Sequence, residues 1–165
     1  MKTVIELSKE DFCSPNNILR QISMPINDFG SEFQEELSYL IETFETIPSG
    51  VGLSAPQIGI FKRFVIINPL KNTGDKNHLI IVNPTYIQSD TTSSDYNETC
   101  LSLPGHRGKV TRNCNILVKY QDGFGIHQEL QATDFIGRIF LHEIDHLDGI
   151  LYVDRMTNAE ELFLG

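Results

Sequence analysis

The segment Leu141–Leu147, with the sequence LHEIDHL, constrains this chain more than any other. Apolar residues recur around it with a helical period, which predicts a helix over about 133–149. On a helix, His142 and His146 lie one turn apart on one face, where both imidazoles can reach one metal ion. Glu143 completes the HExxH pattern, in which a metal activates water and the glutamate handles its proton. Because apolar residues occupy most sides of this helix, we expect it to be buried.

A catalytic metal usually has three protein ligands and one open position, so a third ligand is needed. Cys100 lies in the sequence ETCLSLPG, where the turn-forming residues that follow it place it near the end of a strand. Its thiolate and two imidazoles would make a known catalytic ligand set. A free cysteine is more often a small buried hydrophobe, and on residue type alone we favour that interpretation.

The remaining pattern indicates one domain, 1–165, of the α+β class. We expect mixed or antiparallel β-sheets packed around the buried helix that carries HEIDH, and an N-terminal helix. The expected elements are an extended arm over 16–27, a helix over 29–47, strands over 63–68, 78–87 and 110–120, and a hairpin strand over 126–133.

The charge and the apolar runs exclude several kinds of partner. The net charge is −9, and direct nucleic-acid binding needs clustered Lys and Arg, so we expect none. No apolar run approaches the ~20 residues of a membrane span. Residues 1–10 carry four charges and no long apolar core, so we expect a cytoplasmic location, whether of a cell, an organelle or a virus-infected host. Three cysteines argue against a disulfide framework.

A second segment, Gly50-Val51-Gly52-Leu53-Ser54-Ala55-Pro56-Gln57, is rich in small residues and ends in an amide. Glycines let the backbone approach a ligand closely, and a glutamine amide can donate hydrogen bonds to an oxyanion. Taken alone, such a loop is more often only a turn.

The segments GVGLSAPQ, ETCLS and HEIDH, in this order, resemble the three motifs of the peptide deformylase family: G-φ-G-φ-A-A-x-Q, E-G-C-φ-S and H-E-x-D-H, where φ is apolar. Flanking matches extend the resemblance over roughly residues 16–155. It implies removal of the N-formyl group from N-formylmethionyl nascent peptides, with release of formate. The implied cofactor is one divalent metal, Fe²⁺ in the cell and Zn²⁺ or Ni²⁺ in its place after purification.

The resemblance also assigns roles within the motifs. The implied metal ligands are Cys100, His142 and His146. Glu143 matches the carboxylate that accepts the water's proton and passes it to the leaving amine. Gln57 and the backbone N–H of Leu101 match the pair that stabilises the oxyanion.

For the substrate, the resemblance implies that Gly50, Val51 and Gly52 form an edge that receives the peptide as an added strand. Our candidates for the wall of the methionine pocket, together with Val51, are Tyr96, Phe135, Arg138 and Ile139. We expect the Arg138 head to reach solvent while its stem packs.

Three further residues are expected around the substrate and the Cys100 loop. Glu98, grouped with the substrate-binding residues, is expected to pair with Arg112 and hold the Cys100 loop. Arg107 is expected beside the cleft, where it could receive the peptide's carbonyl or carboxylate groups. We expect Asp145 to orient a ligand or its loop.

Three departures from the family pattern keep other functions open. Thr99 replaces a glycine, Ser54 replaces an alanine, and Leu141 replaces a glutamine. Thr99 and Leu141 leave room for a catalytically silent relative that only binds formyl-methionyl peptides. A zinc peptidase built on HExxH is a weaker alternative, because no further histidine follows His146. Contact with the ribosome exit region also stays open.

Overall fold

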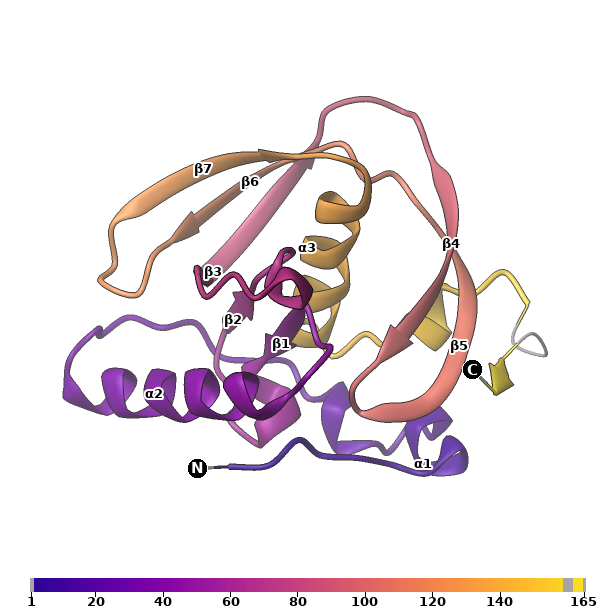
Figure 1. Ribbon diagram of the computed structural model, residues 1–165, viewed down its shortest axis with the longest axis horizontal. Helices are drawn as coiled ribbons and strands as arrows, with labels where there is room; N and C mark the ends of the chain where they lie inside the picture. The colour runs from indigo at the N-terminus through magenta and orange to yellow at the C-terminus, as the bar shows by residue number, and fades with distance from the viewer. Residues whose placement is uncertain (1, 159–161, 165) are drawn as a thin grey trace.

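The computed structural model describes residues 2–158 and 162–164, and in it one helix lies between two β-structures (Figure 1). The α-helices are α1 (Lys9–Cys13), α2 (Ser31–Thr46) and α3 (Asp134–Leu147). The short 3-10 turns are η1 (Ile18–Arg20), η2 (Ala55–Ile58), η3 (Lys71–Thr73) and η4 (Tyr152–Arg155). Among the described residues, no helix has the length and apolarity that crossing a bilayer requires.

The strands form a five-stranded sheet with the order β1-β2-β3-β6-β7 and a three-stranded sheet with the order β4-β5-β8. Every pair of neighbouring strands in the two sheets is antiparallel. The strands are β1 (Gly52–Ser54), β2 (Phe64–Ile67), β3 (Leu79–Gln88), β4 (Ser94–Cys100), β5 (Leu103–Arg112), β6 (Ile116–Gln121), β7 (His127–Ala132) and β8 (Phe163–Leu164). The antiparallel sheets and the helices confirm the predicted α+β class.

Strand β2, next to the edge strand β1, is buried on both faces, so it separates two apolar cores. Phe64 and Ile66 pack in the core that contains the apolar face of α2. Val65 and Ile67 point the other way and pack in the core that contains α3. This alternation follows from the period of two along a strand, and a strand covered on both faces reads as a continuous apolar run.

Helix α3 is buried, as its apolar pattern predicted. It contacts β1, β2, β7 and η2, and in Figure 1 it lies between the five-stranded sheet and the β4–β5 ribbon. Gly137 lets it approach so closely that a Cβ there would collide with the backbone carbonyl of Cys114. The helix therefore carries HEIDH through the centre of the molecule.

The structure differs from the predicted elements in three places. The strand expected over 110–120 is the end of β5 followed by β6, because residues 113–115 leave one sheet and enter the other. The arm over 16–27 is not extended throughout, since η1 interrupts it before Met24 bridges to Lys62. Strand β4 was not predicted, because its sequence SDYNETC has few residues with high β-propensity.

Candidate metal centre and active site

Three potential metal ligands from two elements converge at the centre of the fold. Cys100 is the last residue of β4, and α3 supplies His142 and His146. One ligand atom from each lies within 4.8 Å of the other two, and the Cys100 Sγ atom is 3.3 Å from His146 Nε2. A thiol and two imidazoles are donors that suit divalent transition metals such as zinc or iron. The residues present therefore fit a metal ion.

The two histidines have different surroundings. His142 Nδ1 lies 3.0 Å from Glu98 Oε2, which leaves Nε2 available to a metal, the usual arrangement in which a carboxylate orients a ligating imidazole. Burial, with nearby positive groups, lowers the pKa of His146 and keeps its ring in the neutral form that binds metals.

A buried ionic network holds Glu98 in place. Arg112 donates from Nε and Nη2 to the two oxygens of Glu98, at 2.7 and 3.0 Å. The third nitrogen of the same guanidinium, Nη1, donates to Asp145 at 2.7 Å, and Arg155 also donates to Asp145. Burial raises the pKa of Glu98, but the hydrogen bonds with His142 and Arg112 outweigh burial and hold it well below its usual range. The network therefore keeps Glu98 ionised against His142.

The expected Glu98–Arg112 pair is thus present, and Asp145 contacts arginines rather than a histidine. The expectation for Arg138 was wrong. Its head does not reach solvent, since the side chain is buried and Nη1 donates to Glu98 Oε1 at 2.7 Å and to the Val110 carbonyl at 3.1 Å. Nη2 donates to the Ser94 carbonyl at 2.7 Å. The physical reason is that the Glu98 carboxylate and two backbone carbonyls together offer enough acceptors for a second buried guanidinium, in addition to that of Arg112.

The amide of Gln57 is fixed by Ser54, the residue that departs from the family pattern. The Ser54 backbone N–H and hydroxyl both donate to Gln57 Oε1 at 2.9 Å. The Gln57 Nε2 group then faces Cys100 Sγ at 3.5 Å and donates to Ser102 Oγ at 3.2 Å. Ser54 therefore orients the donor end of the amide toward the candidate metal site.

Glu143 lies beside this site as a buried carboxylate. The residue is 5% exposed, and its Oε2 atom has no hydrogen-bond partner among the described residues. Burial raises the pKa of Glu143 to about 7. A Cβ atom added to Gly52 would lie 2.5 Å from Glu143 Oε1, so only glycine at 52 lets this carboxylate occupy its position.

These groups line a cavity of about 490 Å³ between β1, β4 and α3. Val51, Tyr96, Phe135, Arg138 and Ile139, the candidates for the pocket wall, all line it, and the rings of Tyr96 and Phe135 are 5.7 Å apart. The same cavity is lined by Gly50, Gly52, Gln57, Glu98, Cys100, Leu101, His142 and Glu143. Arg107 does not line it and lies instead in an adjoining groove.

The other two departures from the family pattern are accommodated. Thr99 lies in β4 opposite Arg107, just before a shift in the β4–β5 register at Cys100, and its φ is not positive. It therefore does not turn Cys100 away from His146, whose Nε2 is 3.3 Å from the thiol. Leu141 packs in the apolar core beside α3.

Sequence reasoning did not identify Ser54 or Ser102 as supports of Gln57, or the Tyr152 ring, whose centroid stacks 6.2 Å from that of His142. The position of Ser102 within ETCLS was the only available signal.

Comparisons with known proteins agree with this geometry. The model of the polypeptide deformylase family matches residues 11–161. The peptide deformylase of Rhizobium meliloti (strain 1021) is 35% identical over 146 residues, which cover 88% of this chain and 83% of that protein. The peptide deformylase of Symbiobacterium thermophilum is 37% identical over 155 residues, 94% of this chain and 68% of that protein.

The fold also resembles solved structures. The crystal structure of a peptide deformylase from Legionella pneumophila has a TM-score of 0.83 at 30% identity and covers 98% of this chain and 89% of its own. A peptide deformylase from Plasmodium falciparum has a TM-score of 0.82 at 30% identity, and the match covers 95% of this chain and 87% of that chain.

Proposed function

This chain belongs to the peptide deformylase family, and we propose which of its residues carry out the family's reaction. It is a metal-dependent hydrolase that removes the N-formyl group from formyl-methionine at the start of new polypeptides. The observation that carries the residue assignment is the convergence of Cys100, His142 and His146 beside the buried carboxylate of Glu143.

In the proposed mechanism, Cys100, His142 and His146 hold the metal. When bound, a divalent ion supplies Lewis acidity toward the formyl group and the attacking water near neutral pH. The chain's own contribution is to fix the donors: Glu98 orients His142, and Arg112 and Arg138 hold Glu98.

Glu143 is proposed as the group that moves the proton. Its carboxylate takes the proton of the attacking water and then delivers it to the amine that leaves. A pKa near 7 suits both steps, because the group exchanges a proton readily at neutral pH. Gly52 keeps the carboxylate in this position, because a Cβ at residue 52 would collide with Glu143 Oε1.

Gln57 and the backbone N–H of Leu101 are proposed to stabilise the oxyanion that forms at the formyl carbon. The Gln57 donor group is already oriented by Ser54, so little reorganisation is needed during the reaction. The loss of one such donor costs roughly 3 kcal/mol in other enzymes.

Several finer points belong to the proposal. We propose that Fe²⁺ is the working metal and that Zn²⁺ or Ni²⁺ can replace it, that residues 1–165 act as one catalytic domain, and that the enzyme works in the cytoplasm. The methionine side chain is proposed to lie among Tyr96, Phe135 and Ile139, which line the cavity. An encounter with nascent peptides near the ribosome exit would fit this substrate.

The test is release of formate from a formyl-Met peptide by protein loaded with Fe²⁺ or Ni²⁺ under low oxygen. We expect turnover in the wild type that Glu143→Ala abolishes while the bound metal remains. Tight peptide binding without turnover in the wild type would indicate a silent relative, and cleavage of unformylated peptides would indicate a peptidase. Either result would contradict the proposal.

A further inference from the structure

Two free strand edges face each other across the catalytic cavity. Strand β1 is the outermost strand of the five-stranded sheet, and β4 is the outermost strand of the three-stranded sheet. Residues 50–52 line one side of the cavity and residues 96–101 line the other. An extended peptide in the cavity can therefore hydrogen-bond to a free edge, and its successive side chains then point to opposite sides.

Strand β4 divides the surfaces that those side chains would meet. Its residues Glu98 and Cys100 are buried, whereas the alternate residues Asn97 and Thr99 are exposed. The exposed residues line a second, open groove on the β4–β5 ribbon. Because Tyr96, Asn97 and Thr99 line both the cavity and this groove, the groove begins where the cavity ends.

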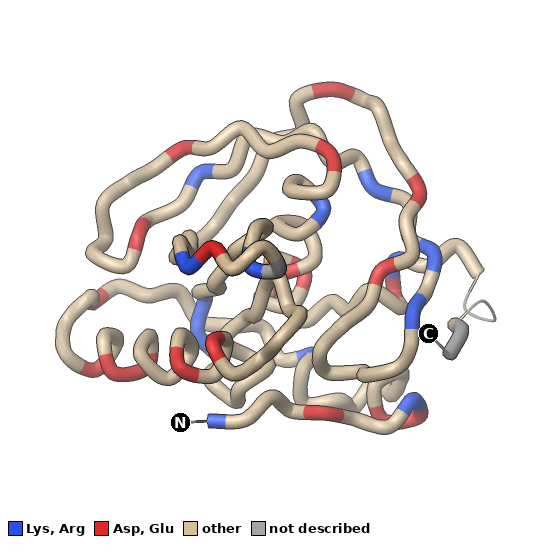
Figure 2. Tube along the Cα trace, viewed as in Figure 1, with Lys and Arg blue, Asp and Glu red and all other residues tan. Residues whose placement is uncertain are grey.

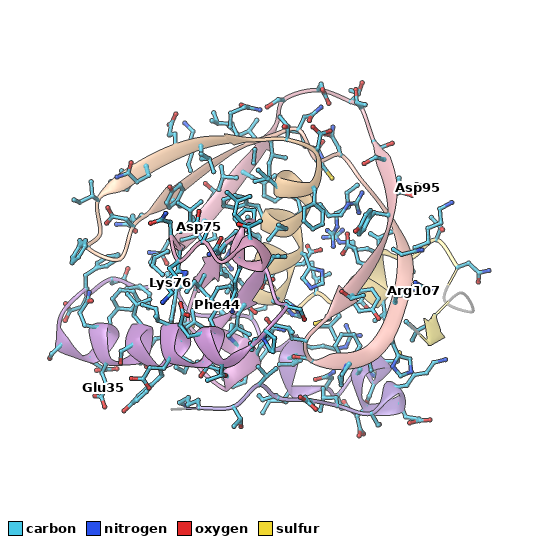
Figure 3. All side chains as sticks on the ribbon, viewed as in Figure 1. Glu35, Phe44, Asp75, Lys76, Asp95 and Arg107 are labelled. Carbon is cyan, nitrogen blue, oxygen red and sulfur yellow. The ribbon has the colours of Figure 1, made fainter. Side chains whose placement is uncertain are left out.

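Among the described residues, one positive charge in the groove has no acidic partner. Lys109 pairs with Asp95 at 2.8 Å. Arg107 is exposed, stands opposite Thr99 on the neighbouring strand, and makes no ion pair with any described residue (Figure 3). Figure 2 shows basic residues along the β4–β5 ribbon, in a chain whose net charge is −9. Arg107 is therefore available to a ligand that supplies a carboxylate.

The position of the reacting carbon fixes which substrate residue reaches Arg107. The formyl carbon must lie at the metal donors, which include Cys100 at the end of β4. The first side chain, methionine, then points into the cavity toward Phe135 and Ile139, which line the cavity and not the groove. By the alternation along an extended chain, the second side chain points to the other side, where Thr99 and Arg107 lie.

We propose that Arg107 is a specificity-determining residue that favours formyl-methionyl peptides with an acidic residue directly after the methionine. This inference rests on the proposed function. A glutamate or aspartate at the second position would pair with the guanidinium, a neutral residue would not, and a lysine would be repelled.

The test compares three formyl-Met-X-Ser peptides, with Glu, Gln or Lys at X, by the kcat/KM for formate release at low salt. For the wild type we expect kcat/KM to be highest with Glu, lower with Gln and lowest with Lys. Each step should be about two- to fivefold, as for a solvent-exposed ion pair. Arg107→Gln should make the three peptides equivalent, and Arg107→Glu should reverse the order. Lys119→Gln is the matched control, because this exposed lysine on β6 lines neither the cavity nor the groove.

A second control acts on the opposite charge. Glu6 is an exposed acid that lines the cavity, so Glu6→Gln should strengthen the preference for the acidic peptide. Equal turnover of the three peptides by the wild type, or an acidic preference that survives Arg107→Gln, would overturn the inference and leave the deformylase assignment intact. Absence of formate from every peptide would overturn the proposed function instead.

Discussion

The two sides of the five-stranded sheet are built on different principles. On the α2 side, the buried cluster contains apolar side chains, among them Phe33, Leu40, Phe44, Phe64 and Ile66. On the α3 side, toward the β4–β5 ribbon, the fold buries five ionisable groups near the candidate metal site: Glu98, Arg112, Arg138, Glu143 and Asp145. Burial of apolar side chains lowers the free energy of the folded state, whereas burial of a charge raises it unless the charge is paired. We infer that the first side supplies stability and the second supplies function at a cost in stability.

On the α3 side, two of the buried carboxylates are paired with arginine side chains. Glu98 and Asp145 are shared between Arg112, Arg138 and Arg155, with donor–acceptor distances of 2.7–3.2 Å. Glu143 is the exception, because one of its oxygens is unpaired among the described residues.

Replacing Glu143 by glutamine should remove function without harming the fold. We expect kcat for formate release to fall by about 10²–10⁴, the usual contribution of a general acid–base group. Glu129→Gln, on exposed strand β7, is the control that should leave the rate unchanged. A Glu143→Gln enzyme within tenfold of the wild-type rate would mean that another group moves the proton.

Arg112→Ala should destabilise the charged side by about 3–5 kcal/mol, because Glu98 and Asp145 are left buried with fewer partners. It should also weaken metal binding, because Glu98 no longer holds His142 firmly. Leu40→Ala in the apolar core should cost about 2–5 kcal/mol and leave the metal affinity unchanged. Chemical denaturation together with metal titration measures both quantities, and equal metal affinities in the two variants would remove the contrast.

In the metal-free protein, Glu143→Gln should increase stability at neutral pH. The folded pKa, about 7, lies above the unfolded value of 4.5, so the wild type loses stability as pH rises from 4.5 to 7. The cost above pH 7 is about 3 kcal/mol. The gain from glutamine should therefore be present above pH 7 and absent below pH 4.5. Denaturation curves across this range give the answer, and a gain independent of pH would contradict the burial of the carboxylate.

Gly52→Ala should lower kcat by about tenfold to a hundredfold, because the new Cβ displaces the Glu143 carboxylate. Gly50→Ala is the matched comparison, since a Cβ there meets only the ends of the Ile47 and Leu101 side chains at 3.0 and 3.1 Å. We expect a smaller loss of kcat in Gly50→Ala. If both variants keep the wild-type kcat and change only KM, Gly52 acts on the substrate alone.

The apolar side could be predicted from the sequence, because its signals are local. The helical spacing of Phe33, Leu37, Leu40 and Phe44 predicted a helix over 29–47, and the structure places α2 at Ser31–Thr46. The strand 63–68 likewise corresponds to β2. In contrast, β4 has alternating exposed polar residues and a buried Glu98, so its composition resembles that of a loop.

The charged side could be predicted only through the motifs. No periodicity connects Cys100 with His142, so their meeting was expected from the resemblance and not from spacing. The buried head of Arg138 was predicted wrongly, because an arginine on an amphipathic helix normally reaches water. Its partners are Glu98 and carbonyls from β4 and β5, and that convergence is a property of the tertiary fold.

Cobalt substitution measures whether one thiolate and two imidazoles share a cation in this protein. We expect the chain to bind one Co²⁺ with a thiolate-to-metal charge-transfer absorption in the near ultraviolet. This absorption should disappear in Cys100→Ser and persist in Cys114→Ser, whose thiol is buried elsewhere. An absorption that survives Cys100→Ser, or that is absent from the wild type, would contradict the account.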